Sequence, residues 1–427
     1  MCLVASTTTV FCLGEQMAMP ELPTPSTYDI RRPSLRWPRR IAKSRSVIIL
    51  VVILGLYILH LLFDDTHYND LSSWAELNDL LSSETDVTLS AEPLTPLGLE
   101  ADRSFHLGST SKARYKAELE HFVTRAFPKR LRKRAHASIE LYLGQSTDLT
   151  TLPQITHRIY QIAKKEPYWT DQRFRSWRDI PGYSYYFFDD SKADKWIRNT
   201  FGGTEIEIVW EKLGAGIKRA DLLRYLLVMV DGGIYSDFDT IRLKPISRWG
   251  QDAEFNGPEL SNPPSLVVGI EADAGYRKDW HKFWPRVIQI CQWTFGAAPL
   301  HPVLIDAVRR VHHTTAMVAI SSVTNVTNKA EGKQTGGEAL NETEPVSVME
   351  WTGPGVFTDA VVRYLAAKHN LTWPALKGLR RPLRIGDMTV LPVTGFSPGV
   401  GMFGAGETTD REAMVHHMFA GSWKKSV

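Results

Sequence analysis

The amino-acid sequence predicts an α/β domain built on a Rossmann-like sheet, preceded by an N-terminal transmembrane helix and a stem. From residue 154 onward, segments with the two-residue period of strands alternate with segments of helical period. Residues 47–63 form an apolar run without a formal charge. The overall composition, 43% hydrophobic and 23% charged residues in a chain of 427, is that of a folded protein.

Residues 47–63 are the predicted membrane anchor, because a run of this length is close to the minimum that crosses a bilayer core. Basic residues gather in residues 31–45 and acidic residues follow in 64–70, so the positive-inside rule keeps the N-terminus in the cytosol. A cleaved signal peptide is disfavoured, since no small-residue cleavage site follows the run. A buried core helix is also disfavoured, because the run has no polar face.

The region after the anchor is polar and has few strand signals, and we interpret it as a stem with some helix. The chain is thereby divided into a cytosolic tail (1–45), a transmembrane signal-anchor (46–63), a lumenal stem (64–150) and the α/β domain (151–427).

The net charge of +3 and the lack of an interleaved aromatic and basic face argue against nucleic acid as a partner. Of the three cysteines only Cys291 falls in the lumenal part, so we expect no intramolecular disulfide there and a buried free thiol instead. Sequons at Asn325, Asn341 and Asn370 fit a secretory compartment and support this topology weakly.

Within the α/β domain, the hydrophobic periods predict individual elements. Strands are expected at residues 154–162, 183–188, 206–210, 234–237, 266–271 and 388–393. Helices are expected at residues 173–177, 192–199 and 218–230. The glycine pair 232–233 ends the last helix, and residues 321–345, which lack periodicity, are expected to form an exposed insertion.

Two aspartates one residue apart, Asp237 and Asp239, follow the strand after the glycine pair. Hard divalent cations prefer oxygen ligands, and residues two apart on a strand point to the same face. We therefore expect Asp239 to touch a metal ion, and Asp237 to reach the ion or a ribose. In isolation such a pair often does no more than solvate a turn.

The preceding helix carries two further candidates, Asp221 and Arg224. Apolar residues wrap most of its surface, so Arg224 is expected to be partly buried, and a buried charge costs several kcal/mol unless it is paired. Asp221 stands three residues earlier, and both an ion pair and a ligand-facing role remain open. The fork of an arginine suits phosphate, which favours a nucleotide-diphosphate site here.

The C-terminal stretch 416–423 gathers imidazole, hydroxyl and indole groups. A histidine of this stretch can complete the coordination of a metal, and Ser422 and Trp423 can bind phosphate or anchor a closing tail, although a tryptophan near a terminus is usually part of a core. Residues 399–404 match G-x-G-x-x-G but lack the strand-turn-helix setting of a dinucleotide site, so we interpret them as a loop.

Residues 218–225 and 232–240 together resemble the D-x-D glycosyltransferases of family 32, and among them most the fungal Golgi transferases with initiation-specific α-1,6-mannosyltransferase activity. The similarity covers most of residues 150–427, with further matching segments at 153–160, 269–273, 291–294, 351–355 and 417–423.

The resemblance implies a GT-A fold, a type II Golgi membrane protein, Mn²⁺ or another divalent cation, and retaining transfer of mannose from GDP-mannose to an N-linked high-mannose glycan. A Golgi mannosyltransferase complex is a candidate partner. The resemblance also assigns roles: Asp221 and Arg224 to the nucleotide sugar, Asp237 and Asp239 to the ribose and metal, His417 to the metal, and Ser422 and Trp423 to the diphosphate. Glu271 and Asp273 are candidates for the acceptor side. Ser236 departs mildly from the aliphatic or small residue usual before the first acid.

Other functions remain open at this level. A relative with the same fold could use another sugar donor or a glycolipid acceptor, and a noncatalytic subunit of a mannan-polymerising complex would only bind the nucleotide sugar. Metal-dependent hydrolysis is a further, weaker alternative. The joint presence of Asp237, Asp239 and Arg224 favours catalysis.

Overall fold

The computed structural model describes residues 111–144, 148–165, 168, 170–214, 216–275, 277–330 and 346–419. Contacts divide the chain into two units, Met1–Thr66 and His67–Val427, and all described residues belong to the second. The expected anchor and most of the expected stem lie outside these residues. Among the helices of the described ranges, none is both long and apolar enough to cross a bilayer.

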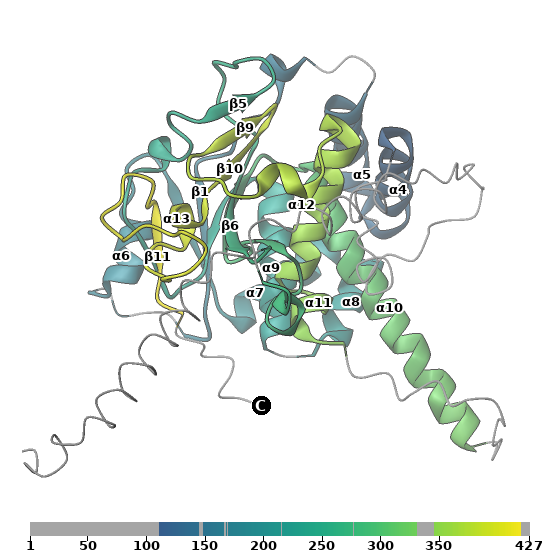
Figure 1. Cartoon of the computed structure of the whole chain (residues 1–427). Helices are drawn as coiled ribbons and strands as arrows, with labels where there is room; N and C mark the ends of the chain where they lie inside the picture. The colour runs from purple at the N-terminus through teal and green to yellow at the C-terminus, as the bar shows by residue number, and fades with distance from the viewer. Residues whose placement is uncertain are drawn as a thin grey trace, which may run out of the picture. The chain divides into compact units, whose positions relative to one another are not determined.

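Nine described strands form one mixed sheet, and two more form a small sheet (Figure 1). The nine strands are β1 (Arg158–Ile162), β2 (Ser184–Phe188), β3 (Gly233–Ser236), β5 (Glu254–Asn256), β6 (Leu266–Asp273), β7 (Ile288–Ile290), β8 (Thr294–Ala297), β9 (Leu383–Ile385) and β10 (Met388–Leu391). Their order is β2-β1-β3-β8-β6-β10-β9-β5, with β7 paired to β6. The small sheet joins β4 (Thr240–Arg242) to β11 (Val415–His417).

The sheet combines parallel and antiparallel pairs. Strands β2, β1 and β3 run parallel to one another. Strand β8 then runs antiparallel to both β3 and β6, and β6 and β10 are again parallel. The predicted α/β class is therefore confirmed, with a sheet that is mixed.

The described helices are α4 (Lys112–Ala126), α5 (Lys129–Leu143), α6 (Gln172–Arg178), α7 (Asp190–Phe201), α8 (Glu205–Lys212), α9 (Ile217–Asp231), α10 (Pro302–Ala330), α11 (Val348–Trp351), α12 (Pro354–His369) and α13 (Val393–Phe396). Helix α10 packs against both α9 and α12, and α9 in turn contacts β1, β3 and β8 (Figure 1). Helix α10 includes residues 321–330, which are the first part of the expected insertion.

The two faces of the sheet carry separate groups of buried side chains, because successive strand residues point to opposite faces. Ile234 packs on one face with Trp177 of α6 and Phe396 of α13. Tyr235, the next residue, packs on the other face in a larger core formed with α9, α10 and α12. Cys291 is fully buried as a free thiol, as expected.

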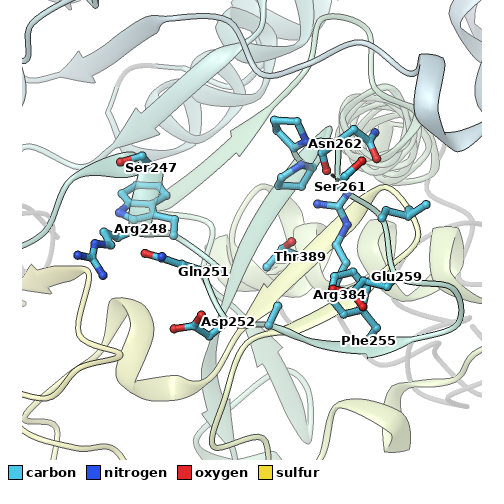
Figure 2. Close-up of a pocket in the computed structure, with 16 residues that line it drawn as sticks. Ser247, Arg248, Gln251, Asp252, Phe255, Glu259, Ser261, Asn262, Arg384 and Thr389 are labelled. Atoms are coloured by element: carbon cyan, nitrogen blue, oxygen red, sulfur yellow. Dashed lines mark hydrogen bonds between the residues drawn. The ribbon is translucent and has the colours of Figure 1, made fainter.

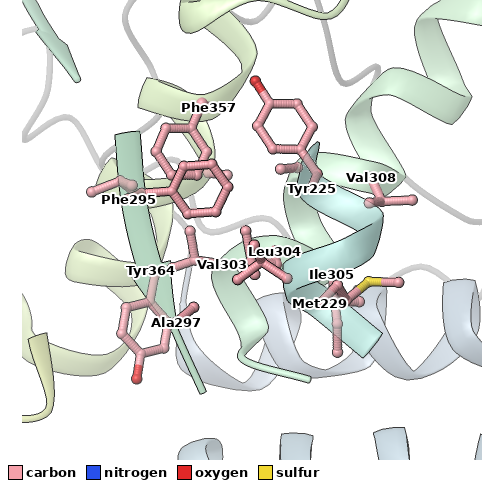
Figure 3. Packing of buried hydrophobic residues seen from close by; sticks show 14 of the residues in the cluster. Tyr225, Met229, Phe295, Ala297, Val303, Leu304, Ile305, Val308, Phe357 and Tyr364 are labelled. Carbon is pink, nitrogen blue, oxygen red and sulfur yellow. The ribbon is translucent and has the colours of Figure 1, made fainter. Parts of the chain in front are cut away.

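Helix α9 is buried on nearly all sides, since it lies between the sheet and α10. Tyr225 stacks on Phe357 of α12 with ring centroids 5.5 Å apart, and Phe295 of β8 lies 4.9 Å from Phe357 (Figure 3). The sequence pattern of this helix is therefore apolar all round rather than amphipathic. A charged group in the buried stretch of α9, residues 221–230, must therefore find its partner inside the protein.

The strand predicted at residues 206–210 is wrong: this segment is helix α8. Ile206, Val209 and Trp210 are buried while Ile208 is 52% exposed, which is the spacing of a helix face. A short run of apolar residues satisfies the two-residue period of a strand equally well, so the local pattern could not separate the two.

Helices α4 and α5 belong to the folded unit, although their residues fall in the expected stem. Tyr115, Phe122 and Ile139 are fully or almost fully buried in the same core as α9 and α10. The carboxylate of Glu118 on α4 forms an ion pair with Arg309 of α10, at 3.0 Å. The folded part therefore begins by residue 112, not near 150.

Glycines 232 and 233 form the tight turn between α9 and β3. Gly233 has a φ of +120°, and a Cβ there would lie 2.6 Å from the carbonyl oxygen of Arg158. We expect Gly233→Ala to lower the free energy of unfolding by about 3 kcal/mol, because it adds a clash with backbone to an unfavourable φ.

The control is Gly203→Ala, at a φ of +72° with no atom within 4 Å of the added Cβ, which should cost about 1 kcal/mol. The free energy of unfolding of both variants is measured by urea denaturation. Equal losses would mean that the close approach at Gly233 relaxes without cost.

Candidate metal centre

The acidic pair lies in a turn just after β3. Strand β3 ends at Ser236, and the chain turns at Phe238 and Asp239 before β4 begins at Thr240. The amide of Asp237 donates to the carbonyl of Trp293 at 2.7 Å, and the hydroxyl of Thr240 donates to the carbonyl of Asp237 at 2.6 Å. The backbone around the first aspartate is thus fixed from both sides.

His417 reaches the acidic pair through the small sheet. Strand β11 pairs antiparallel with β4, with His417 opposite Thr240, and the amide of Met418 donates to the carbonyl of Asp239 at 2.9 Å. The Nε2 atom of His417 lies 3.1 Å from Oδ1 of Asp239. One ligand atom from each of Asp237, Asp239 and His417 lies within 4.8 Å of the others. The structure thereby brings together the three predicted metal ligands.

The imidazole of His417 sits between two aromatic rings. Its ring centroid is 4.1 Å from that of Trp293 and 4.1 Å from that of Phe419. These two tilted ring contacts restrict the orientation of the imidazole, and with it the direction of Nε2 toward Asp239.

Arg224 and Asp221 form a buried ion pair next to the first aspartate of the acidic pair. Only 2% of Arg224 is exposed, and its Nη2 lies 2.8 Å from Oδ1 of Asp221 and 3.4 Å from Oδ1 of Asp237. The side-chain carbonyl of Gln292 accepts from Nη1 of the same guanidinium. Arg224 therefore bridges the helix acid and the first acid of the pair.

Both oxygens of Asp221 are engaged inside the protein. Thr352 donates its hydroxyl to Oδ2 at 2.9 Å, and Gln292 donates its amide to Oδ1 at 3.3 Å. Burial raises the pKa of Asp221 to about 6 against the opposing charge of Arg224. These contacts give Asp221 a structural role in the described chain, and its predicted contact with a nucleotide sugar stays a prediction.

Tyr235 is a site residue that the sequence interpretation did not assign. Its hydroxyl donates to Oδ1 of Asp237 at 2.5 Å, and the guanidinium of Arg224 lies over its ring at 4.9 Å from the centroid. Burial raises the pKa of Tyr235, which keeps the phenol protonated as a donor. Asp237 is thus held by a hydroxyl and a guanidinium together.

Gln292 and Thr352 were also missed as site residues. Both lie in segments that match the resembling family, residues 291–294 and 351–355. That match was the available signal, because nothing in the local period of either segment points to a shared site.

Arg173 of α6 adds a positive charge beside the turn. Its Cζ lies 5.1 Å from the ring centroid of Phe238, the residue between the two aspartates. Its pKa is raised, first by its bond to Asp171 and also by the charge of Asp239. The ion pair with Asp171 holds this guanidinium beside the acidic turn.

The two predicted acceptor-side acids, Glu271 and Asp273, lie at the end of β6 and have different surroundings. Burial raises the pKa of Glu271, and the charges of His417 and Asp237 both act on it. Its Oε2 accepts from the amide of Gln289 at 2.9 Å. Asp273, in contrast, accepts from the backbone amide of Gly378 at 2.6 Å. Ser422 and Trp423 lie outside the described residues.

A pocket of about 750 Å³ lies elsewhere, between residues 247–264 and strands β9 and β10 (Figure 2). It is lined by polar side chains such as Gln251, Asn262 and Arg384. None of the predicted site residues lines it, and β8 and β6 stand between β3 and these strands in the sheet order. The pocket is therefore separate from the metal centre.

The donor set fits a hard divalent cation. Two carboxylates and one imidazole suit Mn²⁺ or Mg²⁺, which leave further positions for substrate oxygens. Nδ1 of His417 is buried and has no hydrogen-bond partner among the described residues, so Nε2 is the nitrogen that faces the carboxylates. The geometry can hold a cation against a phosphate-bearing ligand.

Comparisons with known proteins agree with this chemistry. Residues 157–256 match the family model described as a glycosyltransferase sugar-binding region containing the DXD motif. An initiation-specific alpha-1,6-mannosyltransferase of Schizosaccharomyces pombe is 37% identical, over 58% of this chain and 59% of its own length. A protein of the same name from Saccharomyces cerevisiae is 30% identical, over 57% of this chain and 71% of its own length.

The chain thus spans less than two thirds of the Schizosaccharomyces pombe relative. A solved structure of the PaToxG glycosyltransferase, 14% identical, covers 58% of this chain and 79% of its own, with a TM-score of 0.30 that is too low to support an argument. The match to the family model and the similarity to the Saccharomyces cerevisiae relative together show the family of this chain. It belongs to the glycosyltransferases whose sugar-binding region contains the DXD motif.

Proposed function

We propose that this chain is a Golgi glycosyltransferase that moves mannose from GDP-mannose to an N-linked high-mannose glycan in α-1,6 linkage, with retention of configuration. The observation that carries the proposal is the cluster of Asp237, Asp239 and His417 in a chain 30–37% identical to proteins named as initiation-specific alpha-1,6-mannosyltransferases. The fold we propose is GT-A, supported by the parallel β2-β1-β3 half of the sheet and by the acidic pair at the end of β3.

Asp237, Asp239 and His417 are the residues that would hold the divalent cation, for which we propose Mn²⁺. When bound, the cation neutralises charge on the diphosphate leaving group. Tyr235 and Arg224 both contact the carboxylate of Asp237 and so orient it toward the site. Because Arg224 is almost fully buried in these contacts, we assign it the role of a positioning residue that orients Asp237.

Retention requires the acceptor oxygen to bond to the face of C1 from which the diphosphate departs. The bond between C1 and the diphosphate oxygen breaks, and the proton of the acceptor hydroxyl passes to the departing diphosphate. Glu271, whose pKa is raised by burial, lies in the electrostatic field of Asp237 and His417 and would orient that hydroxyl.

The proposed location is the Golgi membrane, with residues 46–63 as a single-pass type II anchor and the α/β unit in the lumen. The support is the uncharged apolar run flanked by basic residues on its N-terminal side. A Golgi mannosyltransferase complex remains the proposed partner assembly.

The experiment is a donor panel with the full-length chain in detergent. GDP-mannose, GDP-fucose, UDP-glucose, UDP-galactose and UDP-N-acetylglucosamine are each offered with Mn²⁺ and a high-mannose glycan, with and without EDTA. We expect transfer from GDP-mannose alone, and its loss on chelation. Transfer only from a UDP-sugar would refute the proposed donor, and Mn²⁺-dependent GDP binding without turnover would indicate a noncatalytic subunit.

A further inference from the structure

Three loops meet beyond the end of β6 and form what we call the aromatic surface. Its residues are Arg277, Phe283, Trp284, Arg380 and Phe403. The first three belong to the connection between β6 and β7, and the last two come from separate loops more than 90 residues later. Neither the metal centre nor the proposed catalytic step uses any of them.

Hydrogen bonds hold the three loops together. The carboxylate of Asp273 accepts from the amide of Gly378 at 2.6 Å, which ties the end of β6 to the second loop. Nη1 of Arg380 donates to the carbonyl of Gly404 at 2.5 Å, which ties the second loop to the third. The surface is therefore built from fixed loops, not from side chains that happen to be exposed.

The rings are ordered by one another and by a cation. Trp284 meets the ring of Phe403 edge-on, with centroids 5.2 Å apart, and lies 5.5 Å from Phe283. The guanidinium of Arg277 lies over Phe283 at 4.6 Å and near Trp284 at 5.6 Å. Such contacts hold aromatic side chains in place on a surface.

The G-x-G-x-x-G stretch, which carries no nucleotide role, shapes the third loop. Gly399, Gly401 and Gly404 have φ values of +76°, +69° and +66°, and Phe403 itself has a φ of +58°. These left-handed positions let the chain turn sharply and set the Phe403 ring against Trp284. The glycine spacing is thus accounted for by the aromatic surface.

Large apolar side chains remain exposed here. Phe283 is 56% exposed and Met402, next to Phe403, is 43% exposed. An exposed phenylalanine beside the half-buried rings of Trp284 and Phe403 suits a carbohydrate, because the C–H face of a pyranose packs on aromatic rings. The ion pair of Arg277 with Asp279, at 3.0 Å, offers polar groups to the sugar hydroxyls.

Strand β6 carries the proposed acceptor-side acid Glu271 and leads directly into the first loop of the aromatic surface. Glu271 and Asp273 are two residues apart on β6, so their Cα atoms are separated by roughly 7 Å at the usual rise of a strand. Asp273 pairs with Ile288 of β7, only four residues after Trp284. A chain of several sugars that begins at the metal centre can therefore extend along this direction onto the rings.

We propose that the aromatic surface binds the sugars of the acceptor glycan that lie remote from the mannose being extended. The inference rests on the proposed function for the identity of the acceptor. Its role is to select a large, branched glycan over a short mannoside.

The test compares Phe283→Ala and Trp284→Ala with the matched control Phe255→Ala, an exposed phenylalanine (37%) on edge strand β5, far along the sheet order. Steady-state transfer from GDP-mannose is measured with a full-size high-mannose glycan and with α-mannobiose. We expect the KM for the large glycan to rise about tenfold in the two variants, with kcat within about twofold, and no change with mannobiose. The control should match the unmodified chain with both acceptors.

A second measurement separates this inference from the proposed function. Calorimetric titration with the high-mannose glycan alone, without nucleotide sugar or metal, should show a Kd about tenfold weaker in the two variants. If the chain binds the glycan in this way but transfers no mannose, the proposed function fails and the aromatic surface stands. If transfer proceeds and the variants change neither Kd nor KM for the large glycan, the inference is wrong.

Intact binding of the glycan in both variants would assign the aromatic surface to another occupant, such as the membrane, and would overturn the inference. Phe283 is more than half exposed, so its truncation leaves the core intact and an unfolding curve confirms this for each variant.

Discussion

Replacing Asp239 by asparagine is expected to lower kcat/KM for mannose transfer by about a thousandfold or more. Asp239 supplies one of the three ligand atoms of the cluster, and it also faces Nε2 of His417 at 3.1 Å. An amide keeps the shape of the side chain but removes the negative charge that a divalent cation requires. The measurement is steady-state transfer with the full-length chain at saturating Mn²⁺.

The matched control is Asp231→Asn. Asp231 ends α9, six residues before the acidic pair, and forms a partly exposed ion pair with Arg158 at 3.4 Å. Its loss should leave kcat/KM within about twofold, because surface pairs contribute little. A companion titration of Mn²⁺ should show weaker binding in Asp239→Asn alone. Full activity in that variant would remove the cation from the mechanism, and with it the main support for the proposed function.

Replacing Arg224 by methionine is expected to lower the free energy of unfolding by about 4 kcal/mol. The substitution leaves Asp221 buried and fully enclosed, without the charge that it faces at 2.8 Å. We also expect kcat/KM to fall about a hundredfold, because Asp237 loses one of the two groups that orient it. Urea unfolding and transfer assays measure the two effects separately.

The double variant Arg224→Met, Asp221→Asn distinguishes the structural role from the positioning role. It removes the uncompensated charge and should recover most of the stability, while activity stays low because Asp237 is still released. Recovery of both would mean that Arg224 matters only as a partner of Asp221. On the same helix, Arg219→Met is the control: Arg219 is partly exposed and pairs with Asp194 at 3.3 Å, so we expect a loss of about 1 kcal/mol or less.

Local patterns were sufficient for the parts of the site that lie within one stretch of chain. Arg224 stands on a helix whose surface is apolar nearly all round, which predicted its burial, and Asp221 one turn away was the one acid of that turn able to pair with it. The glycine turn and the acidic pair come next in the chain after this helix. A metal-binding element was therefore predictable at residues 232–239. The same reasoning failed at residues 206–210, because five apolar-rich positions fit both a strand and the helix α8 that forms.

Contacts that join distant segments needed the tertiary structure. His417 was assigned to the metal through family resemblance, but its placement beside Asp239, 178 residues earlier, results from the pairing of β11 with β4. Tyr235 follows the local alternation of β3 onto the inner face, yet its bond to Asp237 depends on the turn that follows the strand. The packing of α4 and α5 into the core was not predictable from a polar, basic stretch.

The sequence by itself determined the α/β class, the acidic pair, the buried arginine and the apolar run near the N-terminus, because each depends on residues within one or two turns of one another. Only the tertiary structure decided that Arg224 contacts Asp237 and that Gln292 and Thr352 donate hydrogen bonds to Asp221. It also decided that three separate loops meet in the aromatic surface. The physical reason is that such contacts depend on how the whole chain closes its loops and fills its core, which no local window of residues records.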